Sequence, residues 1–255
     1  MSHQDTYYQN NEAYAQHLAA WDPRLYGKYA TTLQPDRAGA PVLDVGCGVG
    51  QVVRQLTEAG FEAHGVDVSR PNIERARQVS PRCQLYDGRT LPFADGTFAS
   101  AGALNVLEHV DEPEAFIREL VRVVAPGGKI VLSSPNFFRV LGFRDYHHRM
   151  RGLGNKLRNW KRLREKRAQM RSAPGTVRFD RMPPIIREPF RPDDDAIVAT
   201  NALEMRFFLE QAGCESVQVE CTDRHVAAPV DFLLNLGPWR YGMFNSFLVA
   251  RKRAA

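Results

Sequence analysis

The sequence predicts an α/β fold in which helices cover both faces of a mostly parallel sheet. The stretch from Val42 to Gly50, VLDVGCGVG, is a β-branched apolar run that breaks into three alternating glycines. Such a run is typical of a strand buried on both faces that passes through a tight loop into a helix. Further strand-like segments at 62–66 and 83–86 alternate with helix-like ones, as a parallel sheet requires. A chain of 255 residues that is 44% hydrophobic can bury the core of such a sheet.

The glycine loop favours a cofactor other than a dinucleotide. Gly46, Gly48 and Gly50 allow positive φ and leave room for a ligand to approach the backbone. Dinucleotide-binding loops have the spacing G-x-G-x-x-G, which would place glycine where this chain has Gln51. Asp44, just before the loop, would repel a pyrophosphate but attract a cationic amino group. The loop therefore predicts a zwitterionic or cationic cofactor.

Two further carboxylates follow the next two predicted strands. Asp67 ends the strand at 62–66, about 20 residues past the loop, which is the offset at which a carboxylate accepts hydrogen bonds from a ribose diol. Asp87 ends the strand at 83–86. Because open α/β sheets form their ligand crevice at the carboxyl ends of the strands, we expect both acids there. The alternative is that they cap helices or lie in solvent beside ordinary strand-to-helix turns.

Five motifs carry a resemblance to a known family. VLDVGCGVG, GVDVS, DGRTLPFADGTFAS, NVLEHVDEPEAFIREL and APGGKIVLSSPN occur in the order and spacing of class I S-adenosylmethionine-dependent methyltransferases. The chain most resembles the small-molecule subgroup that includes the ubiquinone and menaquinone biosynthesis methyltransferases, over about 42–136 and at the C-terminal end. The resemblance implies a Rossmann-like seven-stranded sheet whose last strand, expected at 243–250, is antiparallel. It also implies S-adenosylmethionine as cofactor and S-adenosylhomocysteine as product.

The resemblance implies roles for individual residues. Gly46 and Gly48 would line the methionine moiety, with Asp44 supporting the loop, and Asp67 would bind the ribose hydroxyls. Asp87 would bind the adenine amino group, and the residue at the end of the fourth strand would face the reacting sulfonium. Cys47 is expected to be a small buried residue rather than a nucleophile. The residues expected at the cofactor are Asp44, Gly46, Cys47, Gly48, Asp67, Val68, Asp87, Gly88 and Asn105.

His109, in the motif NVLEHV, is the candidate catalytic residue. Phosphoethanolamine methyltransferases, which this stretch resembles, have a similarly placed catalytic histidine. If the methyl acceptor is a hydroxyl, a general base assists the transfer, and histidine suits that role near neutral pH. The alternative is a loop histidine that caps the next helix or only packs.

Aromatic and histidine side chains outside the motifs are candidates for the acceptor site. Tyr7, Tyr8 and Tyr14 belong to a helical segment before the sheet, which in related methyltransferases forms a lid over cofactor and acceptor. Packing residues of a covering helix are the other interpretation of these tyrosines. His147 and His148 are expected to lie at the surface or in the substrate pocket. No metal site is expected there, because no carboxylate or cysteine lies nearby at the spacing of metal ligands.

A basic segment lies between the fifth strand and the C-terminal part of the sheet. Residues 139–191 contain 16 Lys or Arg against four Asp or Glu, a net charge of +12, whereas the whole chain carries +5. Within it, the range 153–171 predicts a basic amphipathic helix with an apolar stripe. Three roles remain open: contact with an anionic membrane surface, contact with a polyanionic or phosphorylated acceptor, or packing of the stripe on the protein body. The stripe consists of Leu153, Leu157, Trp160, Leu163 and Met170.

Four arginines further along the same segment leave two interpretations open. They could clamp a phosphate or carboxylate, or they could pair with the acidic run at 193–195. These arginines are Arg178, Arg181, Arg187 and Arg191.

We expect one catalytic domain divided into four parts. These are a helical lid at 1–40, a cofactor-binding core at 41–135, a basic insert at 136–195 that shapes the acceptor pocket, and the end of the sheet at 196–255. The four cysteines form no C-x-x-C pair, and the N-terminal residues are too polar for a signal peptide. We therefore expect a cytoplasmic protein, peripheral to a membrane if the basic helix binds lipid.

The predicted function is S-adenosylmethionine-dependent methyl transfer to a small-molecule, glycan or lipid-linked acceptor, with oxygen as the favoured methylated atom. One alternative is a nucleic-acid methyltransferase that uses the basic insert. It is disfavoured because NVLE stands where amino-directed nucleic-acid methylases carry [D/N]-P-P-[Y/F], and because no cysteine follows a proline. The other alternative is a non-catalytic cofactor-binding module with a membrane or protein partner.

Overall fold

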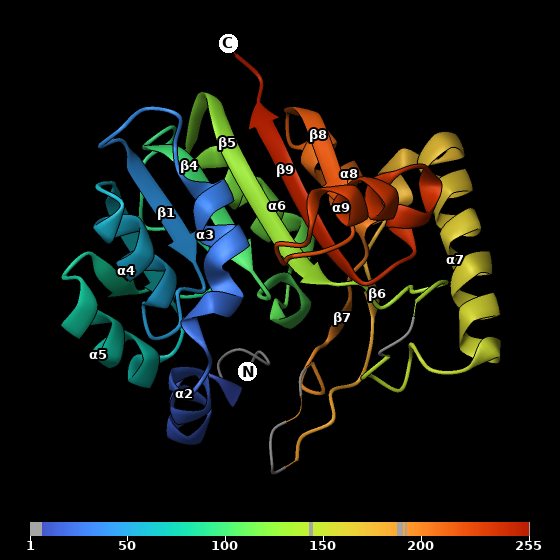
Figure 1. The fold of residues 1–255 in the computed structure, drawn as a ribbon, viewed down its shortest axis with the longest axis horizontal. Coiled ribbons are helices and arrows are strands. Elements are labelled where there is room, and N and C mark those ends of the chain that lie inside the picture. The colour runs from blue at the N-terminus through green and yellow to red at the C-terminus, as the bar shows by residue number, and fades with distance from the viewer. Residues whose placement is uncertain (1–6, 143–144, 188–190, 192, 255) are drawn as a thin grey trace.

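A twisted seven-stranded sheet forms the centre of the molecule (Figure 1). The computed structural model describes residues 7–142, 145–187, 191 and 193–254. Across the sheet the strand order is β3-β2-β1-β4-β5-β9-β8. The strands are Pro41–Val45 (β1), Glu62–Asp67 (β2), Cys83–Leu85 (β3), Phe98–Leu104 (β4), Val124–Pro135 (β5), Cys214–Glu220 (β8) and Asn245–Lys252 (β9).

Strand direction matches the prediction from the motifs. The pairs that join β1 to β2 and β4, β2 to β3, and β4 to β5 are all parallel. The last strand, β9, lies antiparallel between β5 and β8. The predicted α/β class, the seven strands and the antiparallel last strand are therefore confirmed, and the carboxyl ends of β1, β2 and β4 lie at one edge of the sheet.

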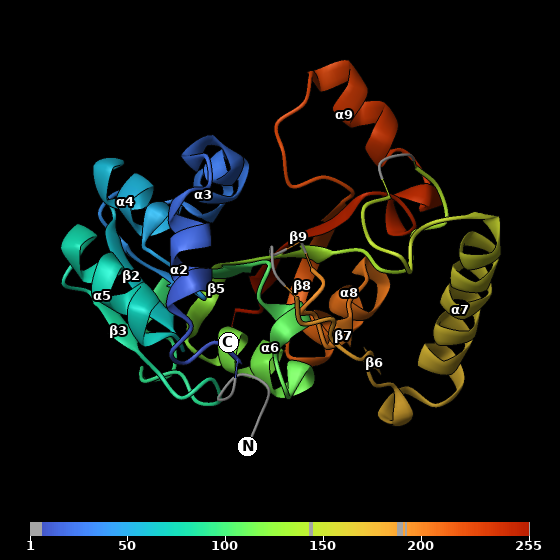
Figure 2. The ribbon, with the colours of Figure 1, turned by 90° about the horizontal axis from the view of Figure 1, so that it is seen from below.

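Helices cover both faces of the sheet and enclose two cores. Val53 and Ile73 belong to the core on one face, and Leu120 and Met205 to the core on the other. Figure 2 shows α3 and α6 on opposite sides of the sheet. The first face carries Gly27–Leu33 (α3), Gln51–Glu58 (α4) and Arg70–Val79 (α5), and the second carries Pro113–Arg122 (α6) and Ala202–Gln211 (α8).

The N-terminal segment lies beyond the carboxyl end of β1. It contains the helix Glu12–Ala19 (α2) and the 3₁₀ turn Pro23–Tyr26 (η1) before α3. The side chain of Asn11 caps α2 by accepting a hydrogen bond from the backbone N–H of Tyr14 at 2.9 Å. The N–H of Arg70, at the start of α5, donates to the carbonyl of Gln9 at 3.0 Å. Figure 1 shows α2 past the arrowhead of β1, so this segment is held over the edge where the strands end.

The segment after β5 builds a small core of its own. The short strands Asp180–Arg181 (β6) and Val198–Ala199 (β7) form an antiparallel ribbon, which reaches beyond the boundary expected at residue 195. Between β8 and β9 lie the helix Ala228–Asn235 (α9) and the turn Pro238–Tyr241 (η4). The buried apolar cluster of the insert consists of Phe137, Phe138, Met150, Met182, Ala196 and Ala199.

The basic helix forms where the sequence predicts it. Its apolar stripe, however, is not packed on the protein body along its whole length, as one of the three interpretations required. The helix α7 spans Leu153–Ser172, and its buried residues are Asn159 and Lys166. Leu153 and Leu157 are 80% and 67% exposed. Of the stripe, Leu163 packs against the small core of the insert. The interpretation that the whole stripe is buried on the protein body is therefore wrong, because polar side chains occupy the inward face of the helix.

Candidate active site

The glycine loop is fixed against the neighbouring strand. The backbone N–H groups of Gly46 and Cys47 donate to the carbonyl of Val66 on β2, at 2.7 and 3.0 Å. Gly46 has φ +74°, and a Cβ at this position would lie 2.3 Å from Cγ2 of Val106. Only glycine fits this point, because both the backbone conformation and the neighbouring side chain exclude a larger residue. The loop therefore keeps its backbone exposed to the space beyond β1.

Two buried carboxyl groups lie at the strand ends beside this loop, and one of them, Asp67, binds it. Asp67 accepts hydrogen bonds from the N–H of Gly48 (2.9 Å), the N–H of Ser69 (2.8 Å) and Nδ2 of Asn72 (3.2 Å). Asp44 accepts one from the hydroxyl of Tyr29 at 2.9 Å. Burial raises the pKa of Asp44 to about 7, and it raises the pKa of Asp67 as well. Both groups would be stabilised in their charged form by a cation bound beside the loop.

One pocket extends from the glycine loop to the N-terminal tyrosines. Its lining includes the loop, Asp67 and Val68 at the end of β2, and Tyr86 after β3. Trp21 and the segment 7–18 contribute further lining residues, and so do Ile185, Arg187, Arg191 and residues 193–195. The pocket therefore lies at the carboxyl edge of the sheet, where the topology of an open α/β sheet predicts a ligand site.

Three polar side chains in this pocket have acceptor atoms without a hydrogen-bond partner among the described residues. These atoms are Oε1 of Gln51, Oδ1 of Asn72 and Oδ1 of Asn105, all buried. Asn105 also has φ +53°, a left-handed conformation that is uncommon outside glycine, and its N–H donates to the carbonyl of Ser133 at 2.9 Å. Buried acceptors without donors are costly, so a ligand rich in N–H and O–H groups would stabilise this site.

Three distant segments meet at the other end of the pocket. The hydroxyl of Tyr8 donates to Oδ2 of Asp195 at 2.6 Å and lies 2.8 Å from Nδ1 of His109. His109 is the last residue of the 3₁₀ turn Leu107–His109 (η2), just after β4. Because the single hydroxyl hydrogen of Tyr8 points to Asp195, the proton between Tyr8 and His109 is assigned to Nδ1 of the imidazole. Neutral His109 then carries its lone pair on Nε2.

Two further carboxyl groups near His109 hold their protons more tightly than usual. Burial raises the pKa of Glu108 well above its ordinary value, and one of its oxygens accepts a hydrogen bond from the hydroxyl of Ser134 at 2.8 Å. Burial raises the pKa of Asp193 to about 7, although a hydrogen bond from the hydroxyl of Tyr146 opposes this shift. Asp193 lines the pocket together with His109, and Glu108 lies behind the lining with Oε1 3.8 Å from Nε2 of His109. Acids with raised pKa values beside an imidazole are typical of acid–base sites.

Most of the residues expected at the cofactor line this pocket, and two do not. The side chain of Asp87 is exposed and accepts hydrogen bonds from the N–H groups of Arg89 (2.8 Å) and Thr90 (2.9 Å), which closes its own turn. Neither Asp87 nor Gly88 is among the described residues that line the pocket. Tyr86, the residue before Asp87, lines the pocket on that side, so the contact expected between Asp87 and the cofactor stays a prediction. The expected residues that line it are Asp44, Gly46, Cys47, Gly48, Asp67, Val68 and Asn105.

The candidates for the acceptor site also divide. Tyr7, Tyr8 and Tyr14 line the pocket, and their rings contact one another edge to face. His147 is buried against the ring of Phe137, with centroids 5.1 Å apart, and also contacts the ring of His148. Neither histidine is among the described lining residues, so a substrate-pocket role for them is not supported by their position.

The arginines of the insert mostly bind within the chain. Arg187 donates to the carboxylate of Asp194 at 2.5 Å. Arg178 donates to the carbonyls of Gly175 and Val177, and Arg181 to those of Val110 and Asp111. Of the two interpretations, pairing with the acidic run therefore holds for Arg187, whereas Arg178 and Arg181 bind backbone carbonyls. Arg187 and Arg191 also line the pocket.

Sequence reasoning missed several residues of the pocket. Gln51 and Asn72 lie in the first turns of α4 and α5, the helices that follow β1 and β2. Their signal was a polar side chain just after a strand-end loop, a position that points toward the crevice. Asp195 was noted only as a possible partner for arginine. Nothing in the sequence joined it to Tyr8, because the two residues are 187 positions apart.

The described residues form neither a metal site nor a helix that could span a membrane. Among the described residues, no cluster of three or more His, Cys, Asp or Glu side chains is placed to hold a metal ion. Within the same ranges, no helix combines the length and the apolar character that crossing a membrane requires.

Comparison with known proteins identifies the core segment. Residues 43–132 match the model of a family described as a methyltransferase domain. The chain is 34% identical over 109 residues to the norajmaline N-methyltransferase of Rauvolfia serpentina. This alignment covers 39% of this chain and 37% of that protein. It is 35% identical over 109 residues to a ubiquinone biosynthesis O-methyltransferase of Xanthomonas oryzae pv. oryzae, which covers 40% and 45%. The aligned stretch thus spans less than half the length of these relatives.

The whole fold has counterparts among solved structures. The chain resembles one from the complex between the Haloferax volcanii Trm112 methyltransferase activator and a putative methyltransferase, with TM-score 0.58 and 17% identity over 95% of this chain and 97% of that chain. The motif-based resemblance to class I methyltransferases is therefore confirmed, and S-adenosylmethionine is the cofactor that the family implies.

Proposed function

We propose, from the methyltransferase domain at residues 43–132, that this protein methylates a hydroxyl group of a small-molecule, glycan or lipid-linked acceptor. The observation that carries the proposal is that one pocket joins the glycine loop to the cluster of Tyr8, His109 and Asp195. A cofactor site and an acid–base site would thus share one pocket, as a group-transfer reaction requires.

The cofactor end of the pocket fits S-adenosylmethionine by its chemistry. Bound S-adenosylmethionine would supply an electrophilic methyl group on a sulfonium. The buried acceptor oxygens of Gln51, Asn72 and Asn105 suit its amino and hydroxyl groups, and Asp44 suits its positive charge. Asp67 already fixes the loop through the N–H of Gly48, so it would both shape the loop and face the ribose.

His109 is proposed as the general base. In the arrangement of Tyr8, Asp195 and His109, the Nδ1 proton points to Tyr8, and the lone pair on Nε2 can accept the proton of an acceptor hydroxyl. Asp195 and Tyr8 would fix the orientation and tautomer of the imidazole. The acceptor oxygen gains nucleophilicity as its proton passes to His109.

The tyrosine cluster is proposed as a lid over the reacting groups. Tyr7, Tyr8 and Tyr14 pack edge to face in the lining of the pocket, to which residues 193–195 also contribute. Burial raises the pKa of Tyr8 and of Tyr14 well above the ordinary value, so both hydroxyls stay neutral. A closed lid excludes water, which would otherwise separate the acceptor from the histidine.

Oxygen is favoured over nitrogen as the methylated atom by the presence of a base. A neutral amine needs no proton removed before attack, whereas a hydroxyl gains from a base at neutral pH. The relatives include both an N-methyltransferase and an O-methyltransferase by name, so similarity alone does not select the atom.

The test begins with isothermal titration calorimetry of the full chain with S-adenosylmethionine, S-adenosylhomocysteine and NAD as control. We expect micromolar binding of the first two alone. An acceptor screen that detects S-adenosylhomocysteine should then find turnover with hydroxyl compounds. Binding without turnover on any acceptor would instead favour the alternative of a non-catalytic module, and absence of binding would refute the proposal.

A further inference from the structure

The outward side of α7 carries a continuous row of exposed side chains with two chemically distinct halves. This row, called the stripe from here on, differs from the predicted apolar stripe, with which it shares only Leu153, Leu157 and Trp160. Its residues follow at alternating intervals of four and three, which places them along a single side of a helix. In the first half Leu153, Leu157 and Trp160 are 80%, 67% and 48% exposed. The second half continues the same side with arginines alone, all exposed. The stripe is formed by Leu153, Leu157, Trp160, Arg164, Arg167 and Arg171.

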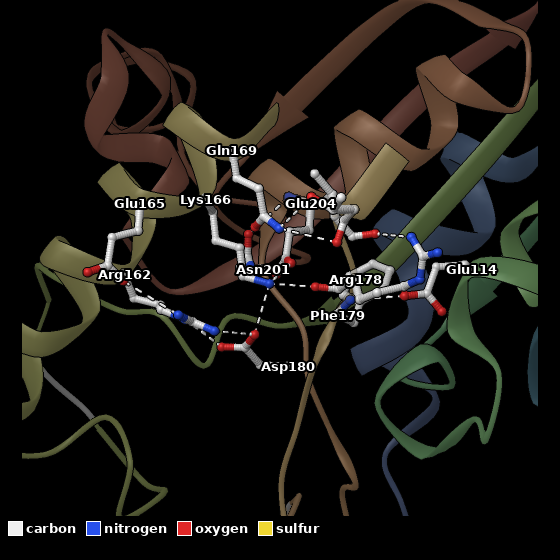
Figure 3. A network of polar contacts seen from close by, with 12 residues as sticks. Glu114, Arg162, Glu165, Lys166, Gln169, Arg178, Phe179, Asp180, Asn201 and Glu204 are labelled. Atoms are coloured by element: carbon white, nitrogen blue, oxygen red, sulfur yellow. Dashed lines mark hydrogen bonds and ion pairs between the residues drawn. The ribbon is translucent and has the colours of Figure 1, made fainter. Parts of the chain in front are cut away.

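The opposite side of the helix is held by buried polar contacts (Figure 3). Lys166 forms ion pairs with Asp180 at 2.8 Å and Glu204 at 2.6 Å, and Arg162 binds both oxygens of Asp180 at 2.7 Å. Asn159 donates to the carbonyls of Phe137 (3.2 Å) and residue 139 (3.0 Å). Rotating α7 to bury its leucines would strip these groups of their partners. The apolar side is therefore held outward.

We propose that this stripe docks on the surface of an anionic lipid bilayer, with α7 lying parallel to the surface. A 20-residue helix is about 30 Å long, so the two halves can contact the bilayer together. Leu153, Leu157 and Trp160 would enter the boundary between headgroups and acyl chains, where tryptophan is favoured. Arg164, Arg167 and Arg171 would bind lipid phosphates.

The charge of the surrounding segment matches this occupant. Residues 139–191 carry a net +12, and the exposed cations Arg158 and Lys161 flank the stripe. Each cation near an anionic surface contributes about 1 kcal/mol of attraction. The guanidinium of Arg164 also lies over the ring of Trp160, 4.8 Å from its centroid, so the apolar and basic halves are in direct contact.

Two other occupants fit the stripe less well. A second copy of this chain would bring arginines of like charge together across the contact. A nucleic acid would satisfy the arginines but would leave Leu153 and Leu157 against a charged phosphate backbone. A bilayer satisfies both halves at once.

The test is flotation of the full chain with two kinds of vesicle, phosphatidylcholine alone and phosphatidylcholine with an equal amount of phosphatidylglycerol. We expect binding to the anionic vesicles at least about tenfold stronger than to the neutral ones, and weakened by salt. Equal binding to both, or binding to neither, would overturn the proposal. The measurement needs no methyl transfer, so its result is independent of the proposed function.

Variants of exposed residues separate the two halves of the stripe. Leu157→Ser with Trp160→Ser should reduce binding to anionic vesicles at least about tenfold, and so should Arg164→Gln with Arg167→Gln and Arg171→Gln. The matched control neutralises three exposed arginines on other elements of the body. That control is Arg37→Gln with Arg54→Gln and Arg118→Gln, and it should retain binding.

Three outcomes would contradict the bilayer as occupant. The first is a loss of vesicle binding in the control variant equal to the loss in the α7 variants, which would mean nonspecific attraction by net charge. The second is a concentration-dependent dimer in sedimentation velocity that Leu157→Ser with Trp160→Ser abolishes. The third is tight binding of duplex DNA or RNA, in place of vesicles, that survives those two substitutions.

Discussion

The cofactor loop and the basic insert are built from opposite kinds of contact. At the loop, backbone N–H groups bind a carbonyl and a carboxylate on the adjacent strand, over apolar cores on both faces of the sheet. In the insert, Lys166 joins Asp180 and Glu204 in a buried ionic cluster, whereas Leu153, Leu157 and Trp160 of the same helix are exposed. A short motif can specify the first arrangement, but the second depends on residues from separate segments.

The difference also concerns how each region resists change. Loop conformation rests on glycines whose backbone no other residue adopts easily, so substitutions act on ligand binding. The ionic cluster rests on charges that are stable only in each other's presence, so removing one partner leaves the others buried and unpaired. The two regions should therefore respond differently to mutation, in affinity at one and in stability at the other.

The largest expected effect is on catalysis. His109→Gln should lower the rate of methyl transfer to a hydroxyl acceptor by about 10² to 10⁴, because the general base is lost. Binding of S-adenosylmethionine should stay within about threefold. Initial rates at saturating cofactor, compared with calorimetry, measure both quantities. His64→Gln, on β2 beside Glu62, is the control and should keep its rate. An unchanged rate in His109→Gln would remove the base from the proposal.

Breaking the ionic cluster should give the next effect. Lys166→Met should lower the free energy of unfolding by about 3–5 kcal/mol, because Glu204 is fully buried and would lose its cationic partner. Urea denaturation measures the change. Lys161→Met, which removes an exposed lysine 3.9 Å from Glu165, should change stability by less than about 0.5 kcal/mol. Similar values for the two variants would show that the cluster is not what holds α7.

The glycine loop should respond in affinity more than in stability. Gly46→Ala should weaken S-adenosylmethionine binding by about 100-fold, because the added Cβ would lie 2.3 Å from Cγ2 of Val106 and shift the loop. Gly60→Ala is the matched control, since Gly60 also has positive φ but has no atom within 4 Å of the added Cβ. It should lower the melting temperature and leave affinity unchanged. Equal losses of affinity would mean that the loop does not bind the cofactor.

The most gradual effect is a pH dependence of stability from Asp44, which is spread over several pH units. Its pKa in the folded protein is raised to about 7, so between about pH 4 and 7 the folded state holds a proton that the unfolded chain releases. Stability from this group therefore falls as pH rises through that window, by at most about 1.4 kcal/mol per pH unit. Asp44→Asn should remove this slope in urea denaturation.

The opposite sign is expected at the surface. The pKa of Asp36 is lowered by hydrogen bonds from Arg251 and Lys129, so its contribution is present above the unfolded pKa and is lost as pH falls. Asp36→Asn should thus change stability fully above about pH 4, and the change should disappear as pH falls through the lowered pKa. For Asp44, the contradicting result is an Asp44→Asn variant that keeps the wild-type slope of stability against pH, because that slope would then come from other groups.

The sequence by itself determined the fold and most of the residues at the glycine-loop end of the pocket. The apolar run before Gly46 and the acid at Asp67 identify strands that end at one edge, and parallel strand order brings those ends together. Asp87 follows the same pattern, but its carboxylate is exposed and closes its own turn by accepting from the N–H groups of Arg89 and Thr90. A position at a strand end is therefore set locally, whereas the direction of its side chain is not.

Only the tertiary structure decided the acceptor end of the pocket and the direction that α7 faces. Tyr8, His109 and Asp195 meet although they are far apart in the chain, and no local pattern encodes such a meeting. The amphipathic pattern of α7 predicted a buried stripe equally well as an exposed one, since periodicity fixes which residues share a side but not what that side contacts. The buried partners of Lys166 settle that choice, because a charge removed from water must keep its counter-charge.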